Sequence, residues 1–244
     1  MSMIKIALCD DNEVERRLLR KIVTAVLQEL HQEVLIVEFS SGEKLQRNFS
    51  RGDYDLIFLD VFMKEMDGIA TGRAIRKKDV KVEIILATGS DQYLREGYEL
   101  HAFAYLMKPY DVMQVRATIC DYFSRNQVST HDEDMEFLRF SVQQKKFCIK
   151  QREISVIESE GRVVYIYHGD EKYRAYQRLN TIEQKLNMKY FLRCNQSYII
   201  NVEQVDGVID YDFHMKNGMV IPIRKRDKKD IVQKYYQKKS ELTD

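Results

Sequence analysis

The sequence predicts two domains of different class, a doubly wound α/β domain followed by a mainly antiparallel β domain with short helices. Three observations support this division. Short apolar runs alternate with longer amphipathic stretches up to about residue 125, a polar and acidic stretch follows, and β-branched or aromatic runs then succeed one another. We therefore expect the first domain at residues 1–125, a linker at 126–136 and the second domain at 137–240.

Five apolar runs in the first domain predict the strands of a parallel sheet. Their Ile, Val, Leu and Phe residues do not alternate strictly with polar residues, which is typical of strands covered by helices on both faces. The runs are Ile4–Cys9, Val34–Phe39, Asp55–Leu59, Val82–Ala87 and Ala102–Met107. Apolar residues at helical spacing predict helices at Glu13–His31 and Asp111–Arg125.

The second domain has shorter runs separated by turn-forming pairs such as Gly169-Asp170. These runs predict antiparallel strands at residues 137–142, 145–150, 153–159, 162–168 and 172–176. A short helix is expected at Leu179–Leu186 and a basic helix at Arg226–Lys239. Between the helices we expect strands at Phe191–Asn201, Val205–Tyr211 and Met219–Ile223, with a hairpin turn at 216–218.

The 244 residues are 44% hydrophobic and 32% charged, which excludes a disordered or fibrous chain. Residues 1–126 carry 18 Lys and Arg against 20 Asp and Glu, whereas residues 135–240 carry 21 against 13, so only the second domain has a basic excess. The four cysteines form no CxxC or Cys/His cluster, which points to a reducing compartment. The first apolar run is too short for a signal peptide, and no apolar stretch has the length of a membrane span. We expect a cytoplasmic protein with no membrane partner.

Polar side chains follow the predicted strands of the first domain, and the carboxyl ends of parallel strands meet at one edge of a sheet. Asp10 and Asp11 follow the first strand, Asp60 the third, Thr88 the fourth and Lys108 the fifth. Alone, each has an ordinary explanation as a helix cap or a turn residue. Their joint occurrence at successive strand ends favours a single site.

Three carboxylates in one site repel one another unless a cation is present, and oxygen ligands without His or Cys favour Mg²⁺. Lys108 supplies a positive charge suited to a phosphoryl group, and the Thr88 hydroxyl can donate a hydrogen bond to a phosphoryl oxygen. A carboxylate is a competent nucleophile for this chemistry. The sequence therefore predicts phosphoryl transfer to an aspartate of the cluster.

These residues, with the segment 105–109 (Tyr-Leu-Met-Lys-Pro), resemble the receiver domain of two-component response regulators over residues 3 to about 125. The resemblance implies a flavodoxin-like fold and phosphorylation of Asp60 by a sensor histidine kinase. It implies a magnesium ion bound by Asp60, by Asp11 directly, by Asp10 through water and by the backbone carbonyl of Phe62.

The same resemblance implies how the switch works. Lys108 would pair with the phosphoryl group, Thr88 would move toward it, and Tyr105 would change rotamer with Thr88; the Lys108-Pro109 bond is expected to be cis. The fourth helix, fifth strand and fifth helix would form the switching surface, at which Tyr98, Tyr105 and Tyr110 gather, and homodimerisation would follow. Tyr98 and Tyr110 fit equally well as core or rim residues. Many receivers have Pro where this chain has Lys64, and we expect that difference to loosen the loop after Asp60.

In the second domain, residues 222–239 carry eight Lys and Arg against two Asp. Such a cluster can neutralise several phosphates, although an exposed terminal helix has the same charge pattern. The segments 156–161, 178–179, 191–201 and 221–223 resemble the LytTR DNA-binding domain over residues 137 to about 239. That family inserts loops into successive major grooves of double-stranded DNA.

By position, the resemblance implies base contacts from Arg162, Asn195, Gln196 and Lys225, and phosphate contacts from Arg193, Ser197, Arg224 and Arg226. Arg and Lys suit guanine, and Asn and Gln suit adenine. Many relatives have His at position 195 and Arg or Asn at position 196. We therefore expect the binding mode to be shared and the base preference to differ.

Together these features predict a response regulator in which phosphorylation of Asp60 promotes dimerisation and sequence-specific promoter binding, and so regulates transcription. Such a protein hydrolyses its phosphate slowly and is not a turnover enzyme. A phosphatase of the haloacid dehalogenase type is an alternative, but it needs a second acid two residues after the nucleophile, where this chain has Phe62. An RNA- or protein-binding output under the same switch is a further alternative, although we find no stacking motif of the RNA-recognition kind.

Overall fold

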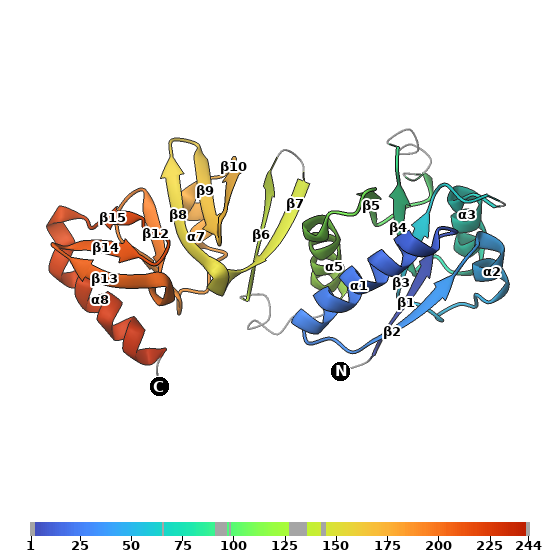
Figure 1. Cartoon of the computed structure of the whole chain (residues 1–244), viewed down its shortest axis with the longest axis horizontal. Helices are drawn as coiled ribbons and strands as arrows, with labels where there is room; N and C mark the ends of the chain where they lie inside the picture. Colours follow the sequence, from blue (N-terminus) through green and yellow to red (C-terminus); the bar gives the residue numbers. More distant parts are fainter. Residues whose placement is uncertain are drawn as a thin grey trace. The chain divides into compact units, whose positions relative to one another are not determined.

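The computed structural model describes residues 3–64, 66–90, 97, 99–126, 136–142 and 145–242. The chain divides into two compact units, Met1–Ile119 and Cys120–Asp244, and each is treated separately (Figure 1). Tyr98 and residues 127–135, which make up most of the predicted linker, lie outside the described residues.

The first unit contains a five-stranded parallel sheet, which confirms the predicted α/β fold. Its strands are β1 (Ile4–Cys9), β2 (Val34–Phe39), β3 (Leu56–Asp60), β4 (Glu83–Thr88) and β5 (Ala104–Met107), in the order β2-β1-β3-β4-β5. Every pairing in the sheet is parallel. All side chains of β3 are buried, as expected of a central strand covered on both faces.

Helices α1 (Glu13–Glu29), α2 (Gly42–Arg47), α3 (Gly68–Lys78) and α5 (Val112–Asn126) surround this sheet. On one face, Leu45 of α2 and Ile75 of α3 belong to the same buried apolar cluster as alternate residues of β1, β3 and β4. An ion pair of 2.6 Å joins Arg116 of α5 to Glu29 of α1. The strand ends are thereby held in a rigid framework.

Helix α1 ends two residues earlier than its apolar pattern predicts. The Asn12 side chain accepts hydrogen bonds from the backbone N–H groups of Val14 and Glu15 and so caps the first turn. At the other end, His31 adopts a left-handed conformation with φ of 53°, while the Gln32 N–H donates to the carbonyl of Leu27. This is a Schellman arrangement, which stops the helix at the residue before its cap.

The second unit is mainly antiparallel β structure with short helices, as predicted. Its strands are β6 (Phe137–Val142), β7 (Lys145–Lys150), β8 (Ile154–Glu160), β9 (Val163–His168), β10 (Glu171–Ala175), β11 (Phe191–Arg193), β12 (Tyr198–Asn201), β13 (Val205–Ile209), β14 (Asp212–Met215) and β15 (Val220–Pro222). They form the sheets β10-β9-β8-β12-β11, β13-β14-β15 and β6-β7. The helices are α7 (Leu179–Glu183) and α8 (Lys228–Glu241), with 3-10 turns η2 (Gln151–Glu153), η3 (Val202–Gln204) and η4 (Lys225–Asp227).

Two predicted strands of this unit are shorter than their composition indicates. The run 191–201 is interrupted by a turn and forms β11 and β12, which pair with each other. The run 205–211 ends at Ile209 because Asp210 and Tyr211 both take positive φ values, 50° and 66°. Positive φ at both central residues characterises a type I′ hairpin turn, which leads here into β14.

Helix α8 is amphipathic despite its many basic residues. Ile231 and Tyr235 are buried in the apolar cluster under the β13-β14-β15 sheet, and the ring of Tyr235 lies 5.3 Å from that of Phe213. The basic side chains are therefore carried on a helix that is anchored to the domain. Among the described residues, no helix has both the length and the hydropathy that crossing a bilayer would require.

Candidate functional site

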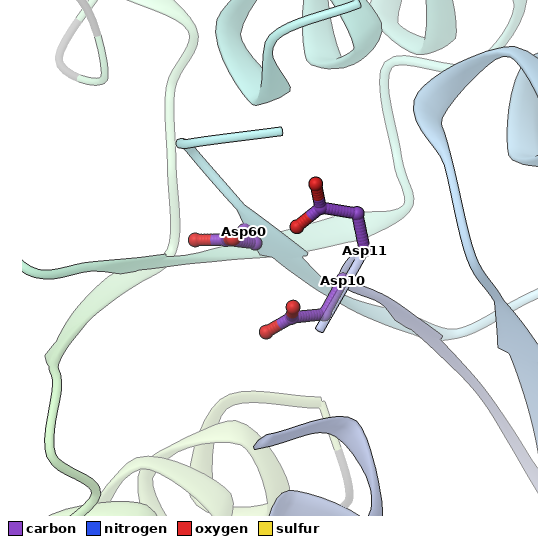
Figure 2. Close-up of side chains that lie close together, drawn as sticks. All are labelled: Asp10, Asp11 and Asp60. Atoms are coloured by element: carbon purple, nitrogen blue, oxygen red, sulfur yellow. The ribbon is translucent and has the colours of Figure 1, made fainter. Parts of the chain in front are cut away.

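The three aspartates predicted at strand ends come together in the first unit. Asp10 directly follows β1 and Asp60 ends β3, and each is only 3% exposed. One carboxylate oxygen from each of Asp10, Asp11 and Asp60 lies within 4.8 Å of the other two (Figure 2). The parallel sheet therefore brings together acids that are 50 residues apart in the sequence.

Lys108 lies among these acids. Its Nζ atom is 2.9 Å from Asp10 Oδ2, 3.0 Å from Asp60 Oδ1 and 2.5 Å from Oε2 of Glu15 on α1. Burial alone would lower the pKa of Lys108, but hydrogen bonds with Glu15 and Asp10 hold that pKa above its ordinary value. The predicted cis Lys108-Pro109 bond is also present.

The site has the chemistry of a divalent-cation site. Burial raises the pKa of the Asp60 carboxyl to about 6; Lys108 opposes the rise and Asp10 adds to it. Two buried carboxylates and a third beside them are costly to keep ionised, and a cation lowers that cost. Because all the offered ligands are oxygens, the donor set fits Mg²⁺ better than a softer metal.

The loop after β3 is held close to the acids. The Phe62 N–H donates to Asp60 Oδ1 at 3.4 Å, and the Lys64 N–H donates to Asp11 Oδ2 at 3.3 Å. A proline at position 64 could not make the second bond, so Lys64 adds a contact between this loop and Asp11. The side chain of Phe62 is largely exposed at the mouth of the site.

Thr88, Tyr105 and Tyr110 are the described residues predicted for the switch. Thr88 is buried, and its hydroxyl donates to the Ser90 carbonyl at 2.9 Å and accepts from the Ser90 N–H at 3.1 Å. Tyr105 packs against the core, and its hydroxyl lies 1.7 Å from the position that a Cβ atom on Gly97 would occupy. Tyr110 lies beside the acidic site, with Lys108 Nζ 5.9 Å from its ring centre, and burial raises the pKa of its phenol.

In the second unit, four predicted DNA-contact residues lie on the β11–β12 turn or next to it. Gln196 is exposed at the tip, and Ser197 is half-buried. The side chains of Arg193 and Asn195 bond to other parts of the domain: Arg193 pairs with Glu183 at 2.5 Å, and Asn195 Nδ2 donates to the Pro222 carbonyl at 2.6 Å.

The remaining candidates lie on two other segments. Arg162 is exposed in the two-residue turn between β8 and β9, where Gly161 has φ of 62° and supplies the conformation that the turn requires. Arg224 is half-exposed and lies 3.4 Å from Asp227, while Arg226 is exposed. The side chain of Lys225 is outside the described part of the structure. The 224–226 segment joins the β11–β12 turn through the bond from the Arg224 N–H to the Cys194 carbonyl.

Comparison with known proteins assigns each of the two units to a domain family. Residues 6–120 match the family model of the response regulator receiver domain, and residues 144–235 match that of the LytTr DNA-binding domain. The chain belongs to the LytTR response regulators. It is therefore a response regulator that acts on DNA through its second domain.

Two curated transcriptional regulatory proteins are similar to this chain. The chain is 29% identical over 215 residues to the transcriptional regulatory protein NatR of Bacillus subtilis (strain 168), a match that covers 87% of this chain and 88% of NatR. It is 33% identical over 165 residues to the transcriptional regulatory protein LytR of Staphylococcus aureus (strain N315), covering 64% and 67%. The receiver (REC) domain of AraT, a response regulator from Geobacillus stearothermophilus, is a solved structure with 26% identity that covers 51% of this chain and 95% of that domain, with a TM-score of 0.44.

Several residues that support the acidic site and the β11–β12 turn were not recognised from the sequence of this LytTR regulator. Glu15 pairs with Lys108, and Gly68 packs so tightly that a Cβ atom there would lie 2.1 Å from the Asp60 carbonyl oxygen. A glycine eight residues after Asp60 was the available signal for this close approach. Glu183 and Asn180 hold Arg193, and nothing in their local sequence indicates that role.

Proposed function

We propose that Asp60 accepts a phosphoryl group from a sensor histidine kinase and that this event controls binding of the second domain to promoter DNA. The observation that carries the proposal is the meeting of Asp10, Asp11 and Asp60, two of which, Asp10 and Asp60, contact the ammonium group of Lys108. A transferred phosphoryl group needs positioning and charge neutralisation more than it needs covalent chemistry from the protein.

In this proposal a magnesium ion would be held by Asp11, Asp60 and the backbone carbonyl of Phe62, and by Asp10 through water. When bound, the ion neutralises charge on the phosphoryl oxygens. The buried acidic cluster supports this assignment, since its carboxylates need a cation to ionise together. Lys108, which already contacts Asp60, would then pair with the phosphoryl group.

The switch would pass from Asp60 to the surface through Thr88 and Tyr105. A phosphoryl group adds roughly −1.5 to −2 charges and three acceptor oxygens. It would draw the Thr88 hydroxyl from its bonds with Ser90, and Tyr105 would move into the vacated space. Homodimerisation through the surface around β5 and α5 would follow, raising affinity for paired sites on DNA.

On the DNA side, the exposed side chains of Arg162 and Gln196 would contact base edges, together with Lys225, while Ser197, Arg224 and Arg226 would contact phosphates. The protein would act in a bacterial cytoplasm, where kinase and promoter meet. Its slow loss of phosphate would reset the switch, and we do not assign it a turnover reaction.

The proposal is tested by selecting duplexes from a random DNA library with the full chain, with and without acetyl phosphate and Mg²⁺. We expect an enriched sequence whose affinity rises with the phosphoryl donor in the wild type and not in Asp60→Asn. Equal enrichment with Asp60→Asn would remove Asp60 from the switch. Preference for single-stranded RNA over every duplex would favour an RNA-binding output instead.

A further inference from the structure

Two segments that lie far apart in the sequence are joined at the DNA-facing edge of the second unit. The first is the turn 194–197 between β11 and β12, and the second runs from Pro222 to Arg226 after β15. Asn195 Nδ2 donates to the Pro222 carbonyl at 2.6 Å, and the Arg224 N–H donates to the Cys194 carbonyl at 3.1 Å. These two hydrogen bonds set the distance between the segments.

The carboxamide of Asn195 is almost fully used by the protein itself. Its Oδ1 atom accepts from the N–H groups of Ser197 at 2.8 Å and Tyr198 at 2.9 Å, which occupies both lone pairs of that oxygen. A bidentate contact with adenine requires one donor and one acceptor from the same carboxamide. Asn195 has one N–H left and no free acceptor, so it could make that contact only by breaking its own turn.

Arg193 supports the turn from its other side. Its Nε and Nη2 atoms donate to the carbonyls of Asn195 and Gln196, each at 3.2 Å. Its Nη1 atom donates to Asn180 Oδ1 at 2.8 Å and to Glu183 Oε2 at 2.5 Å. Four of its five N–H groups are thus engaged within the domain, which leaves little of the guanidinium for a phosphate.

We propose that Asn195 is a positioning residue, which holds the segment bearing Gln196 at a set distance from the segment bearing Arg224, and that it does not contact a base. The inference rests on the proposed DNA-binding function. Preorganised loops lose less conformational freedom on binding, so this link raises affinity without touching DNA. It also fixes the separation of the two groups of base pairs that the segments contact.

Two variants of the full chain separate positioning from base contact. Asn195→Asp keeps the acceptor for the Ser197 and Tyr198 N–H groups and loses the donor to Pro222. Asn195→Ser is neutral, offers a shorter acceptor to the turn and does not reach Pro222. Gln196→Ala, at the exposed neighbour, is the matched control for a base contact.

The probes are duplexes selected by the wild-type chain, each also prepared with one base pair inserted between the two contacted groups. We expect both Asn195 variants to bind the matched duplex about tenfold more weakly, the scale of one lost hydrogen bond. They should keep the wild-type base preference at every position. The inserted base pair should lower their affinity by a smaller factor than it lowers that of the wild type. Gln196→Ala should weaken the base preference at one position, and the inserted base pair should lower its affinity as much as it lowers that of the wild type. If the Asn195 variants relax a single base position with an unchanged insertion penalty, Asn195 contacts a base and the proposal is wrong.

Hydrogen exchange measured without DNA tests the positioning role of Asn195 independently of the proposed function. The Arg224 amide, which donates to Cys194, should exchange with solvent about tenfold faster in both Asn195 variants. The Met215 amide, which donates to Met219 elsewhere in the same unit, should be unchanged. Unchanged exchange at Arg224 would overturn the positioning role even if DNA binding is established. Failure of the wild type to select any duplex, with faster exchange at Arg224, would instead overturn the proposed function.

Discussion

Lys108 balances the charge of the acidic site. Its side chain is 14% exposed and contacts three carboxylates, two of which belong to side chains only 4% exposed. One ammonium group at this position stabilises the buried carboxylates, and it would compete with a metal ion for the same oxygens, since these oxygens attract either cation.

Replacing Lys108 should therefore have opposite effects on stability and on metal binding. In Lys108→Met we expect the free energy of unfolding without added metal to fall by roughly 3 kcal/mol, because buried carboxylates lose their partner. Mg²⁺ affinity, measured by titration calorimetry, should rise about tenfold. Lys44→Met, which removes an exposed lysine near the site, is the control. Weaker Mg²⁺ binding by Lys108→Met would show that the two cations do not compete.

In the second domain, we expect exposed residues that contact bases to affect DNA binding differently from those that contact phosphates. Gln196→Ala should weaken the preference at one base pair, at a cost of about 1–3 kcal/mol, because a base edge loses its partner. Lys229→Ala should weaken binding to all duplexes alike and reduce the slope of log K against log salt by about 1. Binding measured at four or more salt concentrations distinguishes them. Equal effects of both variants on every duplex would remove Gln196 from the base-contacting set.

At the scale of elements, the start of α3 depends on the absence of a side chain at Gly68. A Cβ atom there would lie 2.1 Å from the Asp60 carbonyl oxygen and 2.9 Å from Val61 Cα, both of which are backbone atoms. At Gly89, after β4, a Cβ atom would meet no heavy atom of the described residues within 4 Å. The two glycines thus form a matched pair at the same edge of the sheet.

We expect Gly68→Ala to cost about 1–3 kcal/mol of stability, since backbone must move to admit the methyl group. The same movement displaces Asp60, so labelling by acetyl phosphate should slow. Gly89→Ala should change both quantities little. Thermal unfolding and the rate of labelling check the pair, and labelling of Gly68→Ala at the wild-type rate would show that the α3 start does not position Asp60.

In the second unit, Asn201 links β12 to the η2 region. It is fully buried, its Nδ2 atom donates to the carbonyls of Arg152 and Ile154, and its Oδ1 atom accepts from the Glu203 N–H. Asn201→Ala would remove a hydrogen bond from each of three backbone groups, of which the Arg152 carbonyl keeps its bond from Gln204 Nε2, and should cost about 2–4 kcal/mol. The exposed Asn217→Ala is its control. Hydrogen exchange resolved by peptide should place the loss in the second unit; a loss below 1 kcal/mol would contradict this structural role.

Most elements could be predicted from the sequence because local patterns determine them. The bounds of β1 and β2 match the apolar runs, which end at the polar residues Asp10 and Ser40. The division of the run 191–201 could not be predicted from composition, because its turn depends on the Asn195 side chain accepting two amides. The acidic cluster was predictable since strand ends of a parallel sheet converge. The ion pair of Arg193 was not, because its partner Glu183 lies on another element.

At the scale of the whole molecule, one chain combines an acidic site in a receiver domain with a basic LytTR domain. The first 126 residues have a slight acidic excess, and the second domain concentrates its cations on η4 and α8. Charge added at the first site by a phosphoryl group therefore lies on a different domain from the charges that meet DNA. In the proposed function, a change in the receiver surface such as dimerisation would carry the signal to the second domain.

The account depends most on Asp60 being the phosphate acceptor. The full chain is incubated with acetyl phosphate and Mg²⁺, and the intact mass is measured for the wild type, Asp60→Asn and the exposed hairpin variant Asp170→Asn. We predict one added phosphoryl group per chain in the wild type and in Asp170→Asn, its loss when Mg²⁺ is chelated, and none in Asp60→Asn. A full phosphoryl group on Asp60→Asn would contradict the account.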